Sequence, residues 1–184
     1  TLSFEQETEG ASLLGFRDLV RRLAAEDVNG IRIDAEQYVP DDLLMKAIAE
    51  TSLPSVQVFS FESLEYRGPY LGDLRALFRG CPNLVAARVQ GGGALRPFAA
   101  EHLQFLNVWD GSMDAGFGEA LAKSQTPSLI GAAFDLRTCA RVSAEEVRAW
   151  LESAAPELRG VLLHNVLGPE GFEGMLAARA PTLT

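Results

Sequence analysis

The chain has 184 residues, of which 47% are hydrophobic and 22% charged, so it is neither disordered nor collagen-like, and its length favours one domain over two. Sixteen Lys and Arg against 25 Asp and Glu give a net charge of −9, which opposes binding to nucleic acid or to an anionic membrane. The charge-free stretch Ser124 to Phe134 is too short to span a membrane, and no signal peptide opens the sequence. Two cysteines cannot form a disulfide framework, so we expect a cytoplasmic protein.

A strand pattern recurs along the chain. Most copies open with Pro-x-(Leu or Val), beginning at Pro54, Pro82, Pro127, Pro156 and Pro181. The Leu or Val leads a strand, with further apolar residues three and five positions later. The seven lead residues are Val28, Val56, Leu84, Leu103, Leu129, Leu158 and Leu183. Leu2-x-Phe4 matches the end of an earlier copy. The pattern predicts a strand at each of these places.

Apolar residues at helical spacing lie between most of the predicted strands. The six stripes are Phe16, Leu19, Val20 and Leu23; Leu44, Ala47 and Ile48; Leu74, Leu77, Phe78 and Cys81; Phe117, Ala120 and Leu121; Val147, Trp150, Leu151 and Ala154; and Phe172, Met175 and Leu176. Ser143 and Glu146 have the spacing of a capping box, which predicts where the fifth helix begins. The unit from Leu84 to His102 is shorter than the others and has little room for a helix.

The strand pattern, with most lead residues 25 to 29 positions apart, resembles the leucine-rich repeat family. Its longer, helix-bearing type, similar to ribonuclease inhibitor, fits best, and small bacterial leucine-rich-repeat proteins are loosely similar. The resemblance covers Leu2 to Leu183, although alanine replaces leucine at 87 and 132 and no asparagine ladder follows the strands. It implies an α/β solenoid, or horseshoe, with a parallel sheet on the concave face and helices on the convex face. One domain, 1–184, would hold about six to seven irregular units; the competing interpretation is an ordinary βα domain.

In such a solenoid the residues between the apolar positions form rows across the exposed face of the sheet. The three predicted rows are Gly30, Val58, Ala86, Phe105, Gly131 and Gly160; Arg32, Ser60, Arg88, Asn107, Ala133 and Leu162; and Asp34, Glu62, Gln90, Trp109, Asp135 and His164. The bulkiest side chains fall near the middle. Exposed aromatic residues beside Arg88 favour a protein interface. Two alternatives remain: Phe105 packs against a loop, or Arg32, Glu62 and Arg88 are only a row of ion pairs.

These rows define the predicted partner-binding residues. They are Arg32, Glu62, Arg88, Phe105, Asn107, Trp109, Asp135 and His164. We predict a non-enzymatic protein-interaction module, a scaffold or inhibitor, that binds an unidentified protein partner on its concave face and needs no cofactor. The alternative is a regulator of a GTPase or other enzyme acting through Arg137, Arg141 and Asn165 at the strand-to-helix edge.

The sequence offers little for catalysis or metal binding. His102 and His164 have no carboxylate or cysteine at metal-ligand spacing, so we expect no metal site. We align His102 with the proline of the other units and interpret it as a loop residue. His164 beside Asp135 lacks a convergent nucleophile and oxyanion donors, so we predict no catalytic residues. The glycines at 91–93 lack the Lys-Ser or Lys-Thr of a phosphate loop, and we predict a turn that closes the short unit.

Two further expectations concern the cysteines and the end of the sequence. Cys81 and Cys139 fall two units apart, too far for a disulfide, so we predict two free thiols with Cys81 buried. The last unit stops at Leu183–Thr184 without a polar cap. We therefore expect this end either to continue into a longer protein or to pair with another chain.

Overall fold

The computed structural model describes residues 2–5, 13–35, 43–63, 70–113, 116–139, 143–154 and 157–164. The strands are β1 (Leu2–Glu5), β2 (Gly30–Ala35), β3 (Val58–Ser63), β4 (Tyr70–Asp73), β5 (Ala86–Gln90), β6 (Gly92–Ala94), β7 (Phe105–Met113), β8 (Gly131–Cys139) and β9 (Gly160–His164). The helices are α1 (Leu13–Ala25), α2 (Leu43–Ala49), α3 (Arg75–Gly80), α4 (Phe117–Ala122), α5 (Ala144–Ala149) and the π-helix η1 (Trp150–Ala154).

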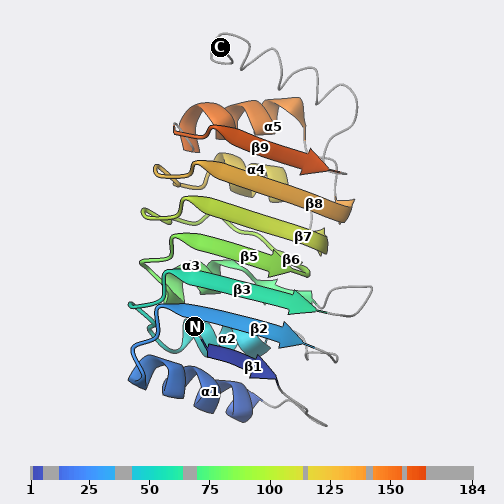
Figure 1. The fold of residues 1–184 in the computed structure, drawn as a ribbon. Helices are drawn as coiled ribbons and strands as arrows, with labels where there is room; N and C mark the ends of the chain where they lie inside the picture. Colours follow the sequence, from blue (N-terminus) through green and yellow to red (C-terminus); the bar gives the residue numbers. More distant parts are fainter. Residues whose placement is uncertain are drawn as a thin grey trace.

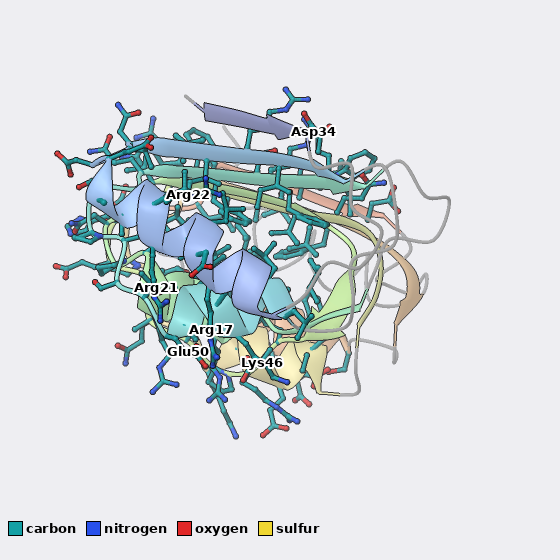
Figure 2. All side chains as sticks on the ribbon, turned by 90° about the horizontal axis from the view of Figure 1, so that it is seen from below. Arg17, Arg21, Arg22, Asp34, Lys46 and Glu50 are labelled. Atoms are coloured by element: carbon teal, nitrogen blue, oxygen red, sulfur yellow. The ribbon has the colours of Figure 1, made fainter. Side chains whose placement is uncertain are left out.

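The strands form one sheet in which every described pair is parallel. Seven strands are neighbours in chain order, β1, β2, β3, β5, β7, β8 and β9. Figure 1 shows them side by side from the amino-terminal to the carboxyl-terminal end of the sheet. The short β6 pairs with the carboxyl end of β7, and β4 pairs with β6. Figures 1 and 2 show the helices on one side of the sheet. The chain is therefore a mixed α/β protein built on a parallel sheet, as the repeat predicts.

The strand predictions are confirmed wherever the structure describes them. Each of the six complete copies begins its strand two residues after its lead residue, from Gly30 after Val28 to Gly160 after Leu158. The predicted remnant at the start is the strand β1. The copy led by Leu183 lies outside the described residues. Strands β4 and β6 were not predicted, because both are very short and carry no apolar alternation.

The recurring proline belongs to a β-turn that precedes strands β3, β5 and β8. The backbone N–H of Val56 donates to the carbonyl of Leu53 at 3.1 Å, and that of Leu84 donates to the carbonyl of Cys81 at 3.2 Å. Leu129 makes the same turn. The proline ring holds φ at the value that the second position of such a turn requires. The tripeptide is therefore a turn signal that places the lead residue at the start of the strand.

The short unit makes this turn without proline and corrects one alignment. The N–H of Leu103 donates to the carbonyl of Ala100 at 3.4 Å, so Glu101 occupies the position of the proline. His102 stands one residue later, and our alignment of His102 with proline is wrong by one position. Its interpretation as a loop residue is confirmed, because His102 lies in an exposed turn.

A backbone ladder joins these turns along the amino edge of the sheet. The carbonyl of Gln57 accepts from the N–H groups of Val85 at 2.7 Å and Ala86 at 3.0 Å. The same pair of hydrogen bonds recurs at four other carbonyls, those of Asn29, Val85, Gln104 and Ile130. From β2 to β9, the start of each strand in the stack is thus hydrogen-bonded to the start of the next. These bonds continue the ladder beyond the paired residues and hold the strands in register.

Five of the six predicted helices are present, and the sixth, with Phe172, lies outside the described residues. The predicted capping box is confirmed: the Ser143 N–H donates to Glu146 Oε2 at 2.7 Å, and the Glu146 N–H donates to Ser143 Oγ at 3.2 Å. These two bonds satisfy N–H groups that the first helical turn leaves free. Helix α5 continues as η1, which carries Trp150 into the core.

The core lies between the helices and one face of the sheet. Phe59, Phe61 and Phe134 are at most 1% exposed. The ring of Phe134 makes edge contacts with Phe117 and Trp150, with centroids 5.3 and 5.7 Å apart. These rings connect β8 to α4 and η1, so the aromatic residues account for much of the packing in the carboxyl-terminal half.

The short unit has no helix between β5 and β7, as predicted, and other groups cover the sheet there. Phe98 stacks on Phe78 of α3, with centroids 4.1 Å apart. The Phe98 N–H donates to Ser124 Oγ at 3.2 Å, and that hydroxyl donates to the carbonyl of Ala120 at 2.7 Å. An aromatic side chain and a buried hydroxyl thus take the place of the missing helix.

The glycine run at 91–93 is only partly a turn. Gly91 has φ of 143°, a backbone conformation that favours glycine, and it is the bend. Gly92 and Gly93 belong to β6, so the prediction of a turn through all three glycines is wrong. A Cβ at Gly93 would lie 2.5 Å from the carbonyl oxygen of Gly72 in β4. Close approach of two backbones explains glycine at that position.

Cys81 is a buried free thiol, as predicted. Burial raises its pKa to about 12, because the charged thiolate loses its water. The side chain of Cys139 lies outside the part of β8 whose side chains are described. Among the described helices, none combines the length and the apolar character that crossing a membrane would require.

Candidate functional site

The face of the sheet turned away from the helices is the candidate site, and we call it the open face. The predicted row that contains Phe105 is in register from Gly30 to Gly160, and the row that contains Arg88 is in register from Arg32 to Leu162. In the third row Asp34 pairs with Glu62, and Gln90, Trp109, Asp135 and His164 follow one another across β5 to β9. The strand register therefore places the predicted residues in the rows that the repeat implies.

Strand β7 places three of the predicted residues side by side. Phe105, Asn107 and Trp109 alternate along it and share the open face. Phe105 is half exposed, whereas Asn107 and Trp109 are partly buried. A Cβ added at Gly131 would lie 3.2 Å from the Phe105 ring, so the ring leans over β8. The ring lies against the neighbouring strand, while half of its surface stays accessible.

Arg32, Glu62 and Arg88 form the ion-pair row that was the alternative interpretation. Glu62 Oε1 lies 3.3 Å from Arg88 Nη1, and Glu62 Oε2 lies 3.8 Å from Arg32 Nη2. Arg32 Nε also donates to Asp34 Oδ1 at 3.0 Å. The hydrogen bond to Asp34, with the charges of Asp34 and Glu62, raises the pKa of Arg32. Both arginines are about half exposed, so such pairs contribute little stability and chiefly orient the guanidinium groups.

Arg88 links the ion pairs to the aromatic residues. Its guanidinium carbon lies 5.1 Å from the centroid of the Trp109 ring, which is a cation–π distance. The indole Nε1 of Trp109 is buried and has no hydrogen-bond partner among the described residues. Arg88 therefore lies over a partly buried indole ring on the open face.

The exposed large hydrophobic side chains of the described residues all lie on the open face. They are Val58 at 48%, Phe105 at 50% and Leu162 at 62% exposed. At β9, the last described strand, the face is low, because Gly160 has no side chain and no atom of the described residues lies within 4 Å of a Cβ added there. Gly131 on β8 lies under the Phe105 ring. Among the described residues, the open face therefore carries apolar projections and a shallow hollow at Gly160.

The remaining predicted site residues lie at the carboxyl ends of β8 and β9. His164 is in register with Asp135, but its side chain lies outside the described residues, as do those of Arg137, Arg141 and Asn165. The described residues therefore do not test the alternative that the chain regulates a GTPase or other enzyme through these residues. Within the described residues, no group of three His, Cys, Asp or Glu side chains is placed to hold a metal ion.

A polar depression of about 330 Å³ lies at the amino edge of the sheet, beside the open face. Its lining residues are Gln57, Asn83, Val85, His102, Gln104 and Ser128. Gln57 and Gln104 precede Val58 and Phe105 in sequence, so the depression borders the row of exposed apolar residues. Sequence reasoning missed it because it treated the turn residues as connectors. The signal was the polar residue directly before the lead residue in three successive units, Asn83, His102 and Ser128.

The helix side differs in character. Figure 2 shows Arg17, Lys46 and Glu50 on the outer side of α1 and α2, away from the sheet. Arg17 Nη2 donates to Glu50 Oε1 at 2.7 Å and ties the two helices together. This hydrogen bond, together with the charges of Arg17, Arg21 and Lys46, lowers the pKa of Glu50. Charged pairs, rather than apolar side chains, face the solvent here.

Comparison with known proteins gives no match: no protein-family model, curated protein or solved structure is significantly similar to the chain.

Proposed function

We propose that the chain is a leucine-rich-repeat solenoid of the helix-bearing, ribonuclease-inhibitor-like type, with the open face on its concave side. Three observations support this: the β-turn that precedes β3, β5, β7 and β8, the carbonyl ladder that joins successive strand starts, and parallel neighbours in chain order with helices on one side. Each is a property of a unit stacked on its own copies.

We infer that the protein is a non-enzymatic interaction module that binds a protein partner on the open face. The observation that carries this proposal is that Val58, Phe105 and Leu162, the exposed large hydrophobic residues of the described chain, share one face. Scattered apolar residues need no explanation, whereas a gathered set beside arginines and a tryptophan is typical of interfaces.

The face also has the features that make binding residues effective. Arg88 is held between Glu62 and Trp109, so it loses little side-chain freedom when a partner binds. Phe105 rests on β8 over Gly131 and brings a large apolar area at low entropic cost. Arginine and aromatic residues in such positions dominate interface energies.

Titration of the purified chain with a partner recovered from native extract tests the proposal. Trp109→Ala and Phe105→Asp should each weaken that binding at least about tenfold while the thermal unfolding transition stays cooperative. Ala24→Asp, an exposed position on α1, is the matched control and should bind like the natural sequence. A partner whose affinity is unchanged by both open-face variants, or lost with Ala24→Asp, would place the interface elsewhere.

A further inference from the structure

Side chains bridge successive turns at the amino edge of the sheet in the first units but not in the later ones. The Ser55 hydroxyl donates to the carboxylate of Asp27, and Asn83 Nδ2 donates to a carbonyl of the turn before β3 at 2.9 Å. These bonds join the turns before β2, β3 and β5. His102 and Ser128 stand at the matching positions before β7 and β8, and their side chains make no hydrogen bond with a described residue. The bridges therefore stop at Asn83, where the polar depression begins.

The hydrogen-bonding groups left free at the depression belong to side chains. The main-chain carbonyls of Gln57 and Gln104 each accept two N–H groups from the next unit, so they are occupied by the ladder. The carboxamides of the same two residues make no hydrogen bond with a described residue. Each carboxamide carries a C=O acceptor and an NH₂ donor side by side. Together with His102 and Ser128, they give the depression both donors and acceptors that the fold itself does not use.

The composition of the depression indicates the kind of ligand that suits it. None of its described lining residues is Asp, Glu, Lys or Arg, so nothing there offers an opposite charge to an ion. A neutral ligand that both donates and accepts hydrogen bonds fits the lining better. Sites for small molecules are concave and mostly apolar, whereas this depression is open and has Val85 as its one apolar lining residue. It therefore suits a segment of a larger molecule that is also held by neighbouring contacts.

Taking the proposed function as given, we propose that the depression binds an uncharged stretch of the partner's main chain beside the contacts on the open face. Gln57 directly precedes Val58 in the chain. Gln104 directly precedes Phe105, so the depression borders the exposed apolar residues. A peptide group has one N–H and one C=O, which a carboxamide complements with its own acceptor and donor.

A sugar is the competing neutral ligand. Its hydroxyl groups also donate and accept, but its ring presents an apolar C–H face that aromatic side chains usually cover. No aromatic side chain is among the described lining residues of the depression. The lining therefore favours peptide groups over a sugar, and the experiment includes both.

Titration with simple probes, followed by the amide resonances of the protein, tests the inference. The first probe is a blocked, uncharged peptide of about six glycine and serine residues, which at millimolar concentration should shift the resonances of Gln57, Val85 and Gln104. A depsipeptide of the same length has esters in place of its peptide bonds and no N–H to donate, so it should bind at least about fivefold more weakly. Equal binding of the two, no shift at the depression, or binding of maltotriose there instead of the peptide would overturn the inference.

Gln57→Leu and Asn29→Leu form a matched pair of variants. Both residues are exposed and directly precede the first residue of a strand, but only Gln57 lines the depression. Gln57→Leu should lower the affinity for the peptide at least about fivefold and leave the melting temperature unchanged, because its carboxamide makes no bond with a described residue. Asn29→Leu should change neither quantity. An unchanged affinity with Gln57→Leu, or an equal loss with Asn29→Leu, would contradict binding in the depression.

Binding of the natural partner separates this inference from the proposed function. If Gln57→Leu and Phe105→Asp both weaken that binding, the partner contacts the depression and the open face together. If only Phe105→Asp weakens it, the open face remains the binding site and the inference about the depression is overturned. If neither variant weakens it, the interface lies elsewhere and both are overturned.

Discussion

The two faces of the sheet are built from alternate residues of the same strands, yet they have opposite character. Toward the helices the apolar positions of the repeat are almost all closed from solvent, as with Phe59 and Phe134. On the other side Val58, Phe105 and Leu162 stay about half exposed or more, among arginines and glycines. Burial of the first set already stabilises the fold, so the second set is not needed for that purpose. This difference is the basis of our proposal that the open face, rather than the helix side, binds a partner.

The largest effect should come from the same substitution made on each face. Phe134→Ala removes a ring that is 0% exposed and contacts Phe117 and Trp150, and should lower the unfolding free energy by about 3 to 5 kcal/mol. Phe105→Ala should cost less than about 1 kcal/mol, since half of that ring is already in water. Urea unfolding followed by circular dichroism measures both. Similar losses would remove the distinction between the faces.

Cys81 reports how tightly the helix side is closed. Its pKa rises from 9.0 to about 12, so near pH 8 the folded protein should hold about a thousandfold less thiolate than the unfolded chain. In a Cys139→Ser background, a thiol reagent should therefore react only through unfolding. Since the folded pKa is the higher one, the contribution of Cys81 to stability should hold below about pH 9 and decline as the pH rises toward 12. Rapid labelling without denaturant would show that the helix side opens locally.

Two glycines should respond in opposite directions to alanine. Gly93→Ala places a Cβ 2.5 Å from the Gly72 carbonyl and should lower stability by more than about 1 kcal/mol. Gly160→Ala places a Cβ where no atom of the described residues lies within 4 Å, and it should raise stability by about 0.5 kcal/mol, because alanine restricts the unfolded chain. Melting temperatures of the two variants, each compared with that of the natural sequence, measure both changes. A loss at Gly160 would mean that the hollow is filled in the folded protein.

The smallest effect should come from the ion pairs of the open face. Glu62→Gln removes the carboxylate between Arg32 and Arg88 and should change the unfolding free energy by less than about 1 kcal/mol, because all three groups are partly exposed. The difference should shrink further at high salt concentration. A loss of several kcal/mol, insensitive to salt, would mean that these charges belong to the structural core.

Much of this fold follows from the repeat. The lead residue, such as Leu84, sits at a turn that its preceding proline makes favourable, and the residues three and five positions later must then point to the helices. The rows of the open face follow because side chains alternate along a strand. Gly91, β4 and β6 show the limit: short strands held by close backbone contact carry no apolar alternation that a sequence displays.

The candidate site is predictable in part for the same reason. The rows that hold Arg88, Phe105 and Trp109 come from periodicity alone, whereas the orientations within them do not. Whether Arg88 lies over Trp109 or points to solvent depends on side-chain torsions, and whether Val58 and Leu162 are covered depends on what packs beside them. Both are tertiary properties. The depression beside Gln57 was missed because it is formed by turns from several units, none of which is unusual by itself.

A comparison of the two faces by photo-crosslinking tests the central claim most directly. A photoreactive phenylalanine analogue placed at position 105 reports on the open face, and the same analogue at the exposed Ala24 of α1 reports on the helix side. After irradiation in native extract, position 105 should give a discrete protein adduct that position 24 does not. An adduct from position 24 alone would contradict the assignment of the open face as the binding face.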